Sequence, residues 1–262
     1  MSRIPSIFKN TKKAFIPFIT AGDSGLDNTF ELMQVLVKNG ADIIELGVPF
    51  SDPMADGPVI AKSHERAVAD GVSLHDVLNL VKKFRQTNNT TAIVLMGYLN
   101  PIEVFGYQAF ANEAQKSGVD GVLVVDMPPE EAHDLKQNLD KNKIDFIFLI
   151  APTTTNERLA SLAKIASGFV YFVSLKGVTG AGNLDVATVN SNLSRIRQFI
   201  DLPVGVGFGI KDATTAKAVA KTADAVIVGS SLVAFIAQYH TNKDKMLKNV
   251  GALANEISGA IK

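Results

Sequence analysis

The chain has 262 residues and a formal net charge of zero, a length that suits one α/β barrel of roughly 250 residues. Hydrophobic residues make up 47% of it, so a sizeable core can form, and nothing indicates a basic nucleic-acid surface or a membrane-binding patch. The absence of cysteine excludes disulfides, thiolate metal ligands and a cysteine nucleophile. Neither a signal peptide nor a long apolar run is found, so we expect a cytoplasmic protein with no membrane or nucleic-acid partner.

Short apolar runs rich in Val, Ile and Phe recur along the chain, separated by longer amphipathic stretches. Each run is nearly continuously apolar, as expected of a strand that is buried on both faces of a parallel sheet. The runs, in chain order, are Ala14–Thr20, Asp42–Gly47, Ala92–Tyr98, Gly121–Asp126, Asp145–Ala151, Gly168–Ser174, Pro203–Gly209 and Ala223–Ser230.

The segments between these runs have helical periodicity or begin with capping residues. Helices are predicted over Thr29–Asn39, Leu74–Arg85, Asn156–Ala166 and Asp212–Lys221, with a final helix at about Asp244–Ile261. Repeated alternation of strand and helix predicts an α/β fold of the (β/α)8 TIM barrel type, with extra short helices and residues 1–262 in a single domain. A doubly wound sheet is the alternative. In such barrels the chemistry lies at the C-terminal strand ends and in the loops that follow.

The second apolar run carries a carboxylate, Glu45, near its C-terminal end. Alternation places it on the same face as Ile43 and Gly47. Burying an unpaired carboxylate is costly, so Glu45 must be paired, protonated or functional. A structural salt bridge is the alternative to a catalytic role.

The loop Val48–Pro58 follows this strand and is longer than the usual βα loop. Three prolines stiffen it, and it carries Asp52 and Asp56. Both acids fit turn-forming aspartates. Asp56 also fits a second role, in which it reaches over the barrel mouth toward Glu45 and the two carboxylates divide acid and base catalysis.

Glycine-rich segments follow the last three apolar runs. Ser174–Gly182 follows the sixth run, Gly205–Gly209 ends the seventh, and Val228–Ser231 ends the eighth, ahead of a short helix from Leu232. Glycines let the backbone approach an anion, and a helix N-terminus offers unpaired N–H groups. These features predict a phosphate site, with simple tight turns as the alternative.

Other chemistry-bearing residues give weaker signals. The histidines are His64, His75, His133 and His240. They fall in helical or surface segments, which indicates solvated side chains and argues against a zinc-dependent aldolase. We expect Lys176 to be a loop lysine rather than a Schiff-base lysine. Tyr171 either lines the barrel mouth or packs in the core.

The segment Ile44–Pro58 closely resembles the signature of tryptophan synthase alpha subunits. The similarity extends to Pro17–Asp23, Leu95–Pro101, Asp126–Pro128, Ser174–Gly180, Gly207–Gly209 and Gly229–Ser230. It implies cleavage of indole-3-glycerol phosphate to indole and glyceraldehyde 3-phosphate, a lyase reaction that requires no metal, flavin or pyridoxal phosphate.

The resemblance also implies roles for individual residues. Glu45 would be the acid–base group at indole C3, and Asp56 would interact with the indole N–H. The implied substrate-binding residues are Phe18 and Tyr98, Tyr171 and Phe208 at the indole, Gly180, Gly209, Gly229 and Ser230 at the phosphate, and Thr179 in a loop that closes over the substrate. Some members carry an arginine where this chain has Leu175, which bears on loop closure and touches no catalytic position.

The implied partner is a tryptophan synthase beta subunit, in an alpha2beta2 heterotetramer. Three alternatives remain. A stand-alone indole-releasing lyase would use the same residues. Another phosphate-binding barrel of the pathway, an isomerase or synthase, would lack the motif that joins Glu45 to Asp56. A catalytically idle barrel kept as an activating partner would have lost one of these two residues, and both are present.

Overall fold

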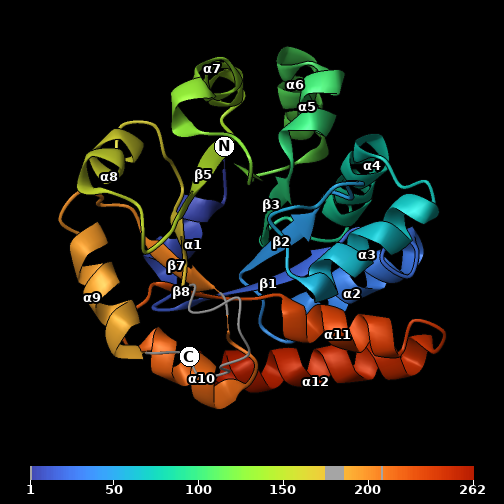
Figure 1. The fold of residues 1–262 in the computed structure, drawn as a ribbon. Coiled ribbons are helices and arrows are strands. Elements are labelled where there is room, and N and C mark those ends of the chain that lie inside the picture. The colour runs from blue at the N-terminus through green and yellow to red at the C-terminus, as the bar shows by residue number, and fades with distance from the viewer. Residues whose placement is uncertain (1, 175–185, 208) are drawn as a thin grey trace.

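The strands of the protein form one closed barrel in which each strand is parallel to both of its neighbours (Figure 1). The computed structural model describes residues 2–174, 186–207 and 209–262. The strands pair in sequence order, and β8 closes the barrel by pairing with β1. The TIM barrel prediction is therefore confirmed, and the open doubly wound sheet is excluded.

The strands are β1 Ala14–Thr20, β2 Ile43–Gly47, β3 Ala92–Gly97, β4 Gly121–Val124, β5 Asp145–Ile150, β6 Val170–Val173, β7 Val204–Gly207 and β8 Ala225–Val228. The helices are α1 Ile4–Asn10, α2 Leu26–Lys38, α3 Pro58–Ala69, α4 Leu74–Arg85, α5 Leu99–Phe105, α6 Tyr107–Ser117, α7 His133–Lys141, α8 Asn156–Leu162, α9 Val186–Ile196, α10 Ala213–Ala220, α11 Ser230–Gln238 and α12 Lys243–Ile261. A short 3₁₀ helix, η1, spans Pro129–Glu131.

Most predicted elements are present, with small shifts at their ends. Helix α4 has the predicted bounds, because Ser73 caps it through a capping box with Asp76. Helix α2 begins three residues before the predicted Thr29, directly after Gly25, whose φ is +91°. Helix α8 ends before the predicted Ala166. Helix α12 packs against α2 and α10 and so completes the outer ring.

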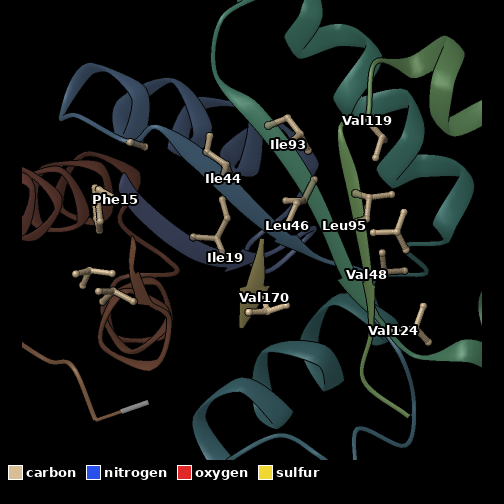
Figure 2. Close-up of a cluster of buried hydrophobic side chains, with 14 of the residues drawn as sticks. Phe15, Ile19, Ile44, Leu46, Val48, Ile93, Leu95, Val119, Val124 and Val170 are labelled. Carbon is tan, nitrogen blue, oxygen red and sulfur yellow. The ribbon is translucent and has the colours of Figure 1, made fainter. Parts of the chain in front are cut away.

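The apolar side chains form two layers, one inside the barrel and one between the strands and the helices. Alternate residues of each strand enter different layers. On β2, Ile43 belongs to the interior cluster, whereas Ile44 and Leu46 pack outward. Figure 2 shows part of the outer layer, with Ile44, Leu46 and Leu95 among the labelled side chains. The alternation predicted for β2 is confirmed.

Helix α1, which the sequence patterns did not predict, lies at the end of the barrel where the strands begin. Its Ile4 is fully buried in the interior cluster, and the ring of Phe8 packs against Phe169 with centroids 5.8 Å apart. Arg3, just before the helix, donates to the Asp120 carboxylate at 2.9 Å. The helix therefore covers the interior at the end opposite the strand C-termini.

A repeated hydrogen bond joins the strands in pairs at this same end. A side chain just before each even-numbered strand accepts a hydrogen bond from a backbone N–H of the preceding odd-numbered strand. The pairs are Phe15 N–H to Asp42 at 2.8 Å, Ile93 N–H to Asp120 at 2.8 Å, Phe146 N–H to Ser167 at 2.9 Å, and Val204 N–H to Asp224 at 2.9 Å. Each of the three carboxylates also contacts a cation: Asp42 contacts Lys262, Asp120 contacts Arg3 and Arg85, and Asp224 contacts Arg197. We call these four bonds the strand-pair bonds.

Candidate active site

Glu45 is a buried carboxyl inside the barrel. It lies in register between Phe18 of β1 and Val94 of β3 and is 1% exposed. Among the residues that the structure describes, none hydrogen bonds with its Oε1. Burial, reinforced by the nearby charge of Asp56, raises the pKa of Glu45 to about 8. The carboxyl is therefore protonated at neutral pH and has a proton to donate.

Asp56 lies near the end of the loop that joins β2 to α3. Its Oδ2 accepts a hydrogen bond from the Tyr98 hydroxyl at 2.8 Å, and that hydroxyl accepts one from the Ala55 N–H at 3.0 Å. The ring of Phe50 stacks on Tyr98, with centroids 5.0 Å apart. Burial raises the pKa of Asp56, while the bond from Tyr98 acts in the opposite direction. Tyr98, expected among the substrate-binding residues, thus contacts Asp56 directly.

Tyr171 lies in the interior cluster, on a strand face it shares with Val173 as predicted. Burial and the charges of Glu45 and Asp56 raise the pKa of its phenol well above the ordinary value, so the hydroxyl keeps its proton. The space for this hydroxyl comes from β7, because a Cβ at Gly207 would lie 2.2 Å from the phenol oxygen. Three protonatable side chains from different elements, those of Glu45, Asp56 and Tyr171, therefore interact electrostatically.

Phe18 connects this region to the start of α11. It is 3% exposed on β1. Its ring occupies the space where a Cβ of Gly47 would lie, at only 2.7 Å, and a Cβ of Gly229 would lie 3.3 Å from the Cβ of Phe18. Both glycines thus let the aromatic side chain pack closely against the neighbouring backbone.

Gly209 and Ser230 both lie exposed beyond the ends of β7 and β8. Gly209 has a φ of +75°, in the left-handed region that favours glycine. Ser230 begins α11, directly after Gly229. The Ser231 hydroxyl donates to the Ile210 carbonyl at 3.4 Å and so connects the two segments. The first N–H groups of a helix have no partner within it, so this end of α11 is suited to an anion.

Some predicted site residues lie outside the part of the chain that the structure describes. They are Phe208, Thr179 and Gly180, together with Leu175 and Lys176 of the same segment.

The expectation of solvated histidines is wrong for one of the four. His75, His133 and His240 are exposed, whereas His64 on α3 is 2% exposed. Its Nε2 lies 3.6 Å from Oδ2 of Asp56. Apolar spacing on α3 gives no clear signal for this burial, because one turn beyond His64 the side chain of Ala67 is buried whereas Val68 is 38% exposed.

Outside the cluster formed by Glu45, Asp56, Tyr98 and Tyr171, the described part of the chain shows few features of other kinds of site. Within the described residues, no group of three or more His, Asp or Glu side chains could hold a metal ion. No helix in that part of the chain combines the length and apolar character needed to cross a membrane. Surface grooves of about 580 and 380 Å³ lie between helices, the first lined by α2, α4 and α12, and neither is lined by a residue of the cluster.

The fold and this cluster define a class of protein. A buried, protonated carboxyl lies close to a second carboxylate that a tyrosine holds, and a helix N-terminus follows the last strand of the same barrel. Groups with pKa values displaced in this way are typical of general acid–base catalysis. The protein is a (β/α)8 barrel that holds a buried pair of carboxyl groups of the kind found in acid–base enzymes.

Comparison with known proteins identifies the family. The profile of the family described as tryptophan synthase alpha chain matches residues 6–262. The tryptophan synthase alpha chain of Ruthia magnifica subsp. Calyptogena magnifica is 75% identical, with 100% of both chains covered. The crystal structure of tryptophan synthase subunit alpha from Legionella pneumophila str. Paris superimposes with a TM-score of 0.92 at 42% identity, covering 100% of this chain and 98% of that one. A chain of the tryptophan synthase complex from Pyrococcus furiosus gives a TM-score of 0.84 at 36% identity, covering 94% and 98%.

The chain therefore belongs to the tryptophan synthase alpha chain family, and it is a lyase of tryptophan biosynthesis. The resemblance found in the sequence is confirmed. The alternative of an isomerase or synthase from the same pathway finds no support in these comparisons.

Proposed function

We propose that the cluster around Glu45 and Asp56 carries out the retro-aldol cleavage of indole-3-glycerol phosphate to indole and glyceraldehyde 3-phosphate. The observation that carries the proposal is the protonated carboxyl of Glu45, buried inside the barrel with its Oε1 contacted by no described donor. The family assignment supports it, because the alpha-chain role in tryptophan biosynthesis requires a source of indole.

Glu45 supplies the first proton. Its carboxylic acid protonates indole C3, which converts the ring to an indoleninium ion. The electrons of the bond between C3 and the substrate's glycerol phosphate group then flow toward N1 as that bond breaks, and indole is restored. The hydroxyl on the glycerol carbon that was bonded to C3 loses its proton as that carbon becomes the aldehyde. The Glu45 carboxylate accepts this proton. The net change moves one proton from oxygen to carbon and regenerates the acid.

Asp56 acts at the other end of the indole ring. Positive charge develops on N1 when C3 is protonated, and an ionised carboxylate that accepts the N1–H stabilises this charge. The contact from Tyr98 falls on Oδ2 of Asp56, so Oδ1 is the oxygen available to the substrate. A protonated Glu45 and an ionised Asp56 divide the roles of acid and electrostatic stabiliser.

The remaining site residues bind the substrate in this proposal. Phe18 and Tyr171 provide apolar and hydroxyl-bearing surface for indole, and the family resemblance adds Phe208. Gly209, Gly229 and Ser230 bind the phosphate through backbone N–H groups and the N-terminus of α11. The resemblance alone assigns Gly180 to the phosphate and Thr179 to a closing loop.

We also propose that the chain acts with a tryptophan synthase beta subunit, in an alpha2beta2 assembly. A related chain is part of a tryptophan synthase complex in Pyrococcus furiosus. The loop that holds Asp56 presents Met54, which is 80% exposed, so a partner that packs on this side chain would also order Asp56. Because indole crosses membranes readily, direct transfer to a partner in the cytoplasm would prevent its loss.

We further propose that residues 1–262 form one barrel domain. The helix α12, near the C-terminus, packs on both α2 and α10, which supports this proposal.

Indole release by the purified chain tests the proposed function. Glu45→Gln and Asp56→Asn should each keep the fold and lower cleavage by about 10²–10⁴-fold. Asp52→Asn is the matched control, because this carboxylate lies on the same loop but is exposed and bonded only to Ser51 among the described contacts. A folded Glu45→Gln protein that retains most of the turnover rate would refute the assignment. An alpha chain whose activity gains nothing from added beta subunit would favour the stand-alone lyase.

A further inference from the structure

His64 contacts both the beginning and the end of the loop that carries Asp56. Its Nδ1 accepts a hydrogen bond from the Phe50 N–H at 3.1 Å, and its Nε2 lies 3.6 Å from Oδ2 of Asp56. The side chain is buried between these two contacts. One imidazole therefore links the geometry of the loop to the position of the proposed catalytic carboxylate.

The contact with Phe50 determines which ring nitrogen carries the hydrogen. A peptide N–H can only donate, so Nδ1 must be unprotonated, and the hydrogen of a neutral imidazole then lies on Nε2. Burial lowers the pKa of His64 to about 4, so the ring is neutral near pH 7. The group that faces Asp56 is therefore an N–H donor.

Helix α3 holds this imidazole in place through contacts outside the loop. The hydroxyls of Ser63 and Thr20 lie 2.6 Å apart, which ties α3 to the end of β1. Arg66 donates to both carboxylate oxygens of the fully buried Asp23, at 2.7 and 3.0 Å. A side chain on an element fixed in this way is suited to orient another group.

We propose that His64 is a positioning residue for Asp56: its Nε2–H donates to Oδ2 when substrate is bound and keeps Oδ1 directed at the indole N–H. This inference rests on the proposed function of Asp56. The separation of 3.6 Å exceeds that of an N–H···O hydrogen bond, and catalytic hydrogen bonds often tighten only in the substrate complex. Tyr98 already donates to the same oxygen, so the two donors would fix the carboxylate from different sides.

Two substitutions separate this role from that of a simple loop anchor. Asn at position 64 places an amide oxygen near the position of Nδ1, so His64→Asn keeps an acceptor for the Phe50 N–H but removes the donor that faces Asp56. Gln is longer and reaches the position of Nε2, so His64→Gln keeps that donor and leaves the Phe50 N–H unpaired. His133→Asn, at an exposed position on α7, is the matched control.

The rate of indole-3-glycerol phosphate cleavage should distinguish the two variants. His64→Asn should lower kcat/KM by about 10- to 100-fold, the effect of losing one hydrogen bond to a charged group. His64→Gln should lower it less, and His133→Asn should leave it unchanged. The opposite order, with Asn near wild type and Gln impaired, would show that His64 only anchors the loop and would overturn the proposal.

The pH profile provides a readout that an anchoring role would not change. The groups that face Asp56 are Glu45 from β2, Tyr98 at the start of α5, Tyr171 from β6 and His64 from α3. Loss of a donor to a carboxylate raises its pKa. The acid limb of kcat, which reports pKa values in the substrate complex, should therefore move up by about one pH unit in His64→Asn, which matches a tenfold loss of preference for the ionised form. An acid limb that stays in place would overturn the proposal.

Asp56→Asn separates failure of this inference from failure of the proposed function. If Asp56→Asn is inactive and His64→Asn behaves like wild type, the proposed function stands and the inference fails. If Asp56→Asn remains active, both fail. NMR of ¹⁵N-labelled histidine gives a test that needs no activity, with the His64 signals recognised by their absence in His64→Asn. The hydrogen should lie on Nε2, and Asp56→Asn should shift that signal; a hydrogen on Nδ1 would overturn the proposal.

Discussion

Replacing Glu45 with glutamine should stabilise the protein while it destroys catalysis, and the gain should depend on pH. Burial raises the pKa of Glu45 from 4.5 to about 8. Each pKa unit corresponds to about 1.4 kcal/mol, so the ionised group is about 5 kcal/mol less favourable in the barrel than in the unfolded chain. Between about pH 4.5 and 8 the folded protein holds a proton that the unfolded chain has lost, so Glu45 makes the free energy of unfolding fall as pH rises. Glutamine does not titrate and removes this dependence.

Urea unfolding of both proteins at a series of pH values between 5 and 9 measures this effect. The difference in free energy of unfolding, Glu45→Gln minus wild type, should rise by several kcal/mol across the range and level off above about pH 8. Taking the difference cancels the titration of groups that both proteins share. A difference that stays constant within about 1 kcal/mol would refute the reasoning, because Glu45 would then have an ordinary pKa in the folded state.

Two further outcomes test the phosphate site and the partner surface. Gly209→Asp should sharply weaken binding of indole-3-glycerol phosphate in calorimetry, because it places a negative charge beside the N-terminus of α11. Affinity for an unphosphorylated indole analogue should change little. Equal loss for both ligands would indicate a structural defect, since Gly209 also has a positive φ. Met54→Asp should reduce the stimulation of indole formation by added beta subunit more than it reduces the basal rate, because Met54 is 80% exposed and so is open to a partner. An identical response of the variant and the wild type to the beta subunit would show that this loop does not couple the subunits.

The barrel could be predicted from the sequence because its strands are buried on both faces. A run such as Ala14–Thr20 is buried at every position, so continuous apolar character marks its bounds without any knowledge of its neighbours. Glu45 was recognisable for the same reason, as a carboxylate within such a run. Helix α1 was missed because it is only seven residues long, and its apolar side chains acquire meaning only from the interior that they cover.

The environment of Asp56 could not be read from the sequence. Its contacts come from Tyr98, after β3, and from His64, on α3, and no local pattern indicates that these side chains meet. The prediction of a solvated His64 failed because helical periodicity describes one helix face, whereas this imidazole is buried against a loop. Such contacts depend on the closed sheet, which brings the ends of neighbouring strands together.

The strand-pair bonds bear on circular permutation, in which the original chain ends are joined and new termini are opened elsewhere. Each bond joins an odd-numbered strand to the even-numbered strand that follows it, so the barrel is built of four consecutive segments that each contain both partners of one bond. New termini introduced between segments, for example before β3, would leave every donor and acceptor on the same continuous stretch. New termini between β3 and β4 would place Ile93 and Asp120 at opposite ends of the polypeptide, and their bond would then form only on closure of the whole barrel. The protein is in this sense modular in pairs of strands, although its sheet is continuous.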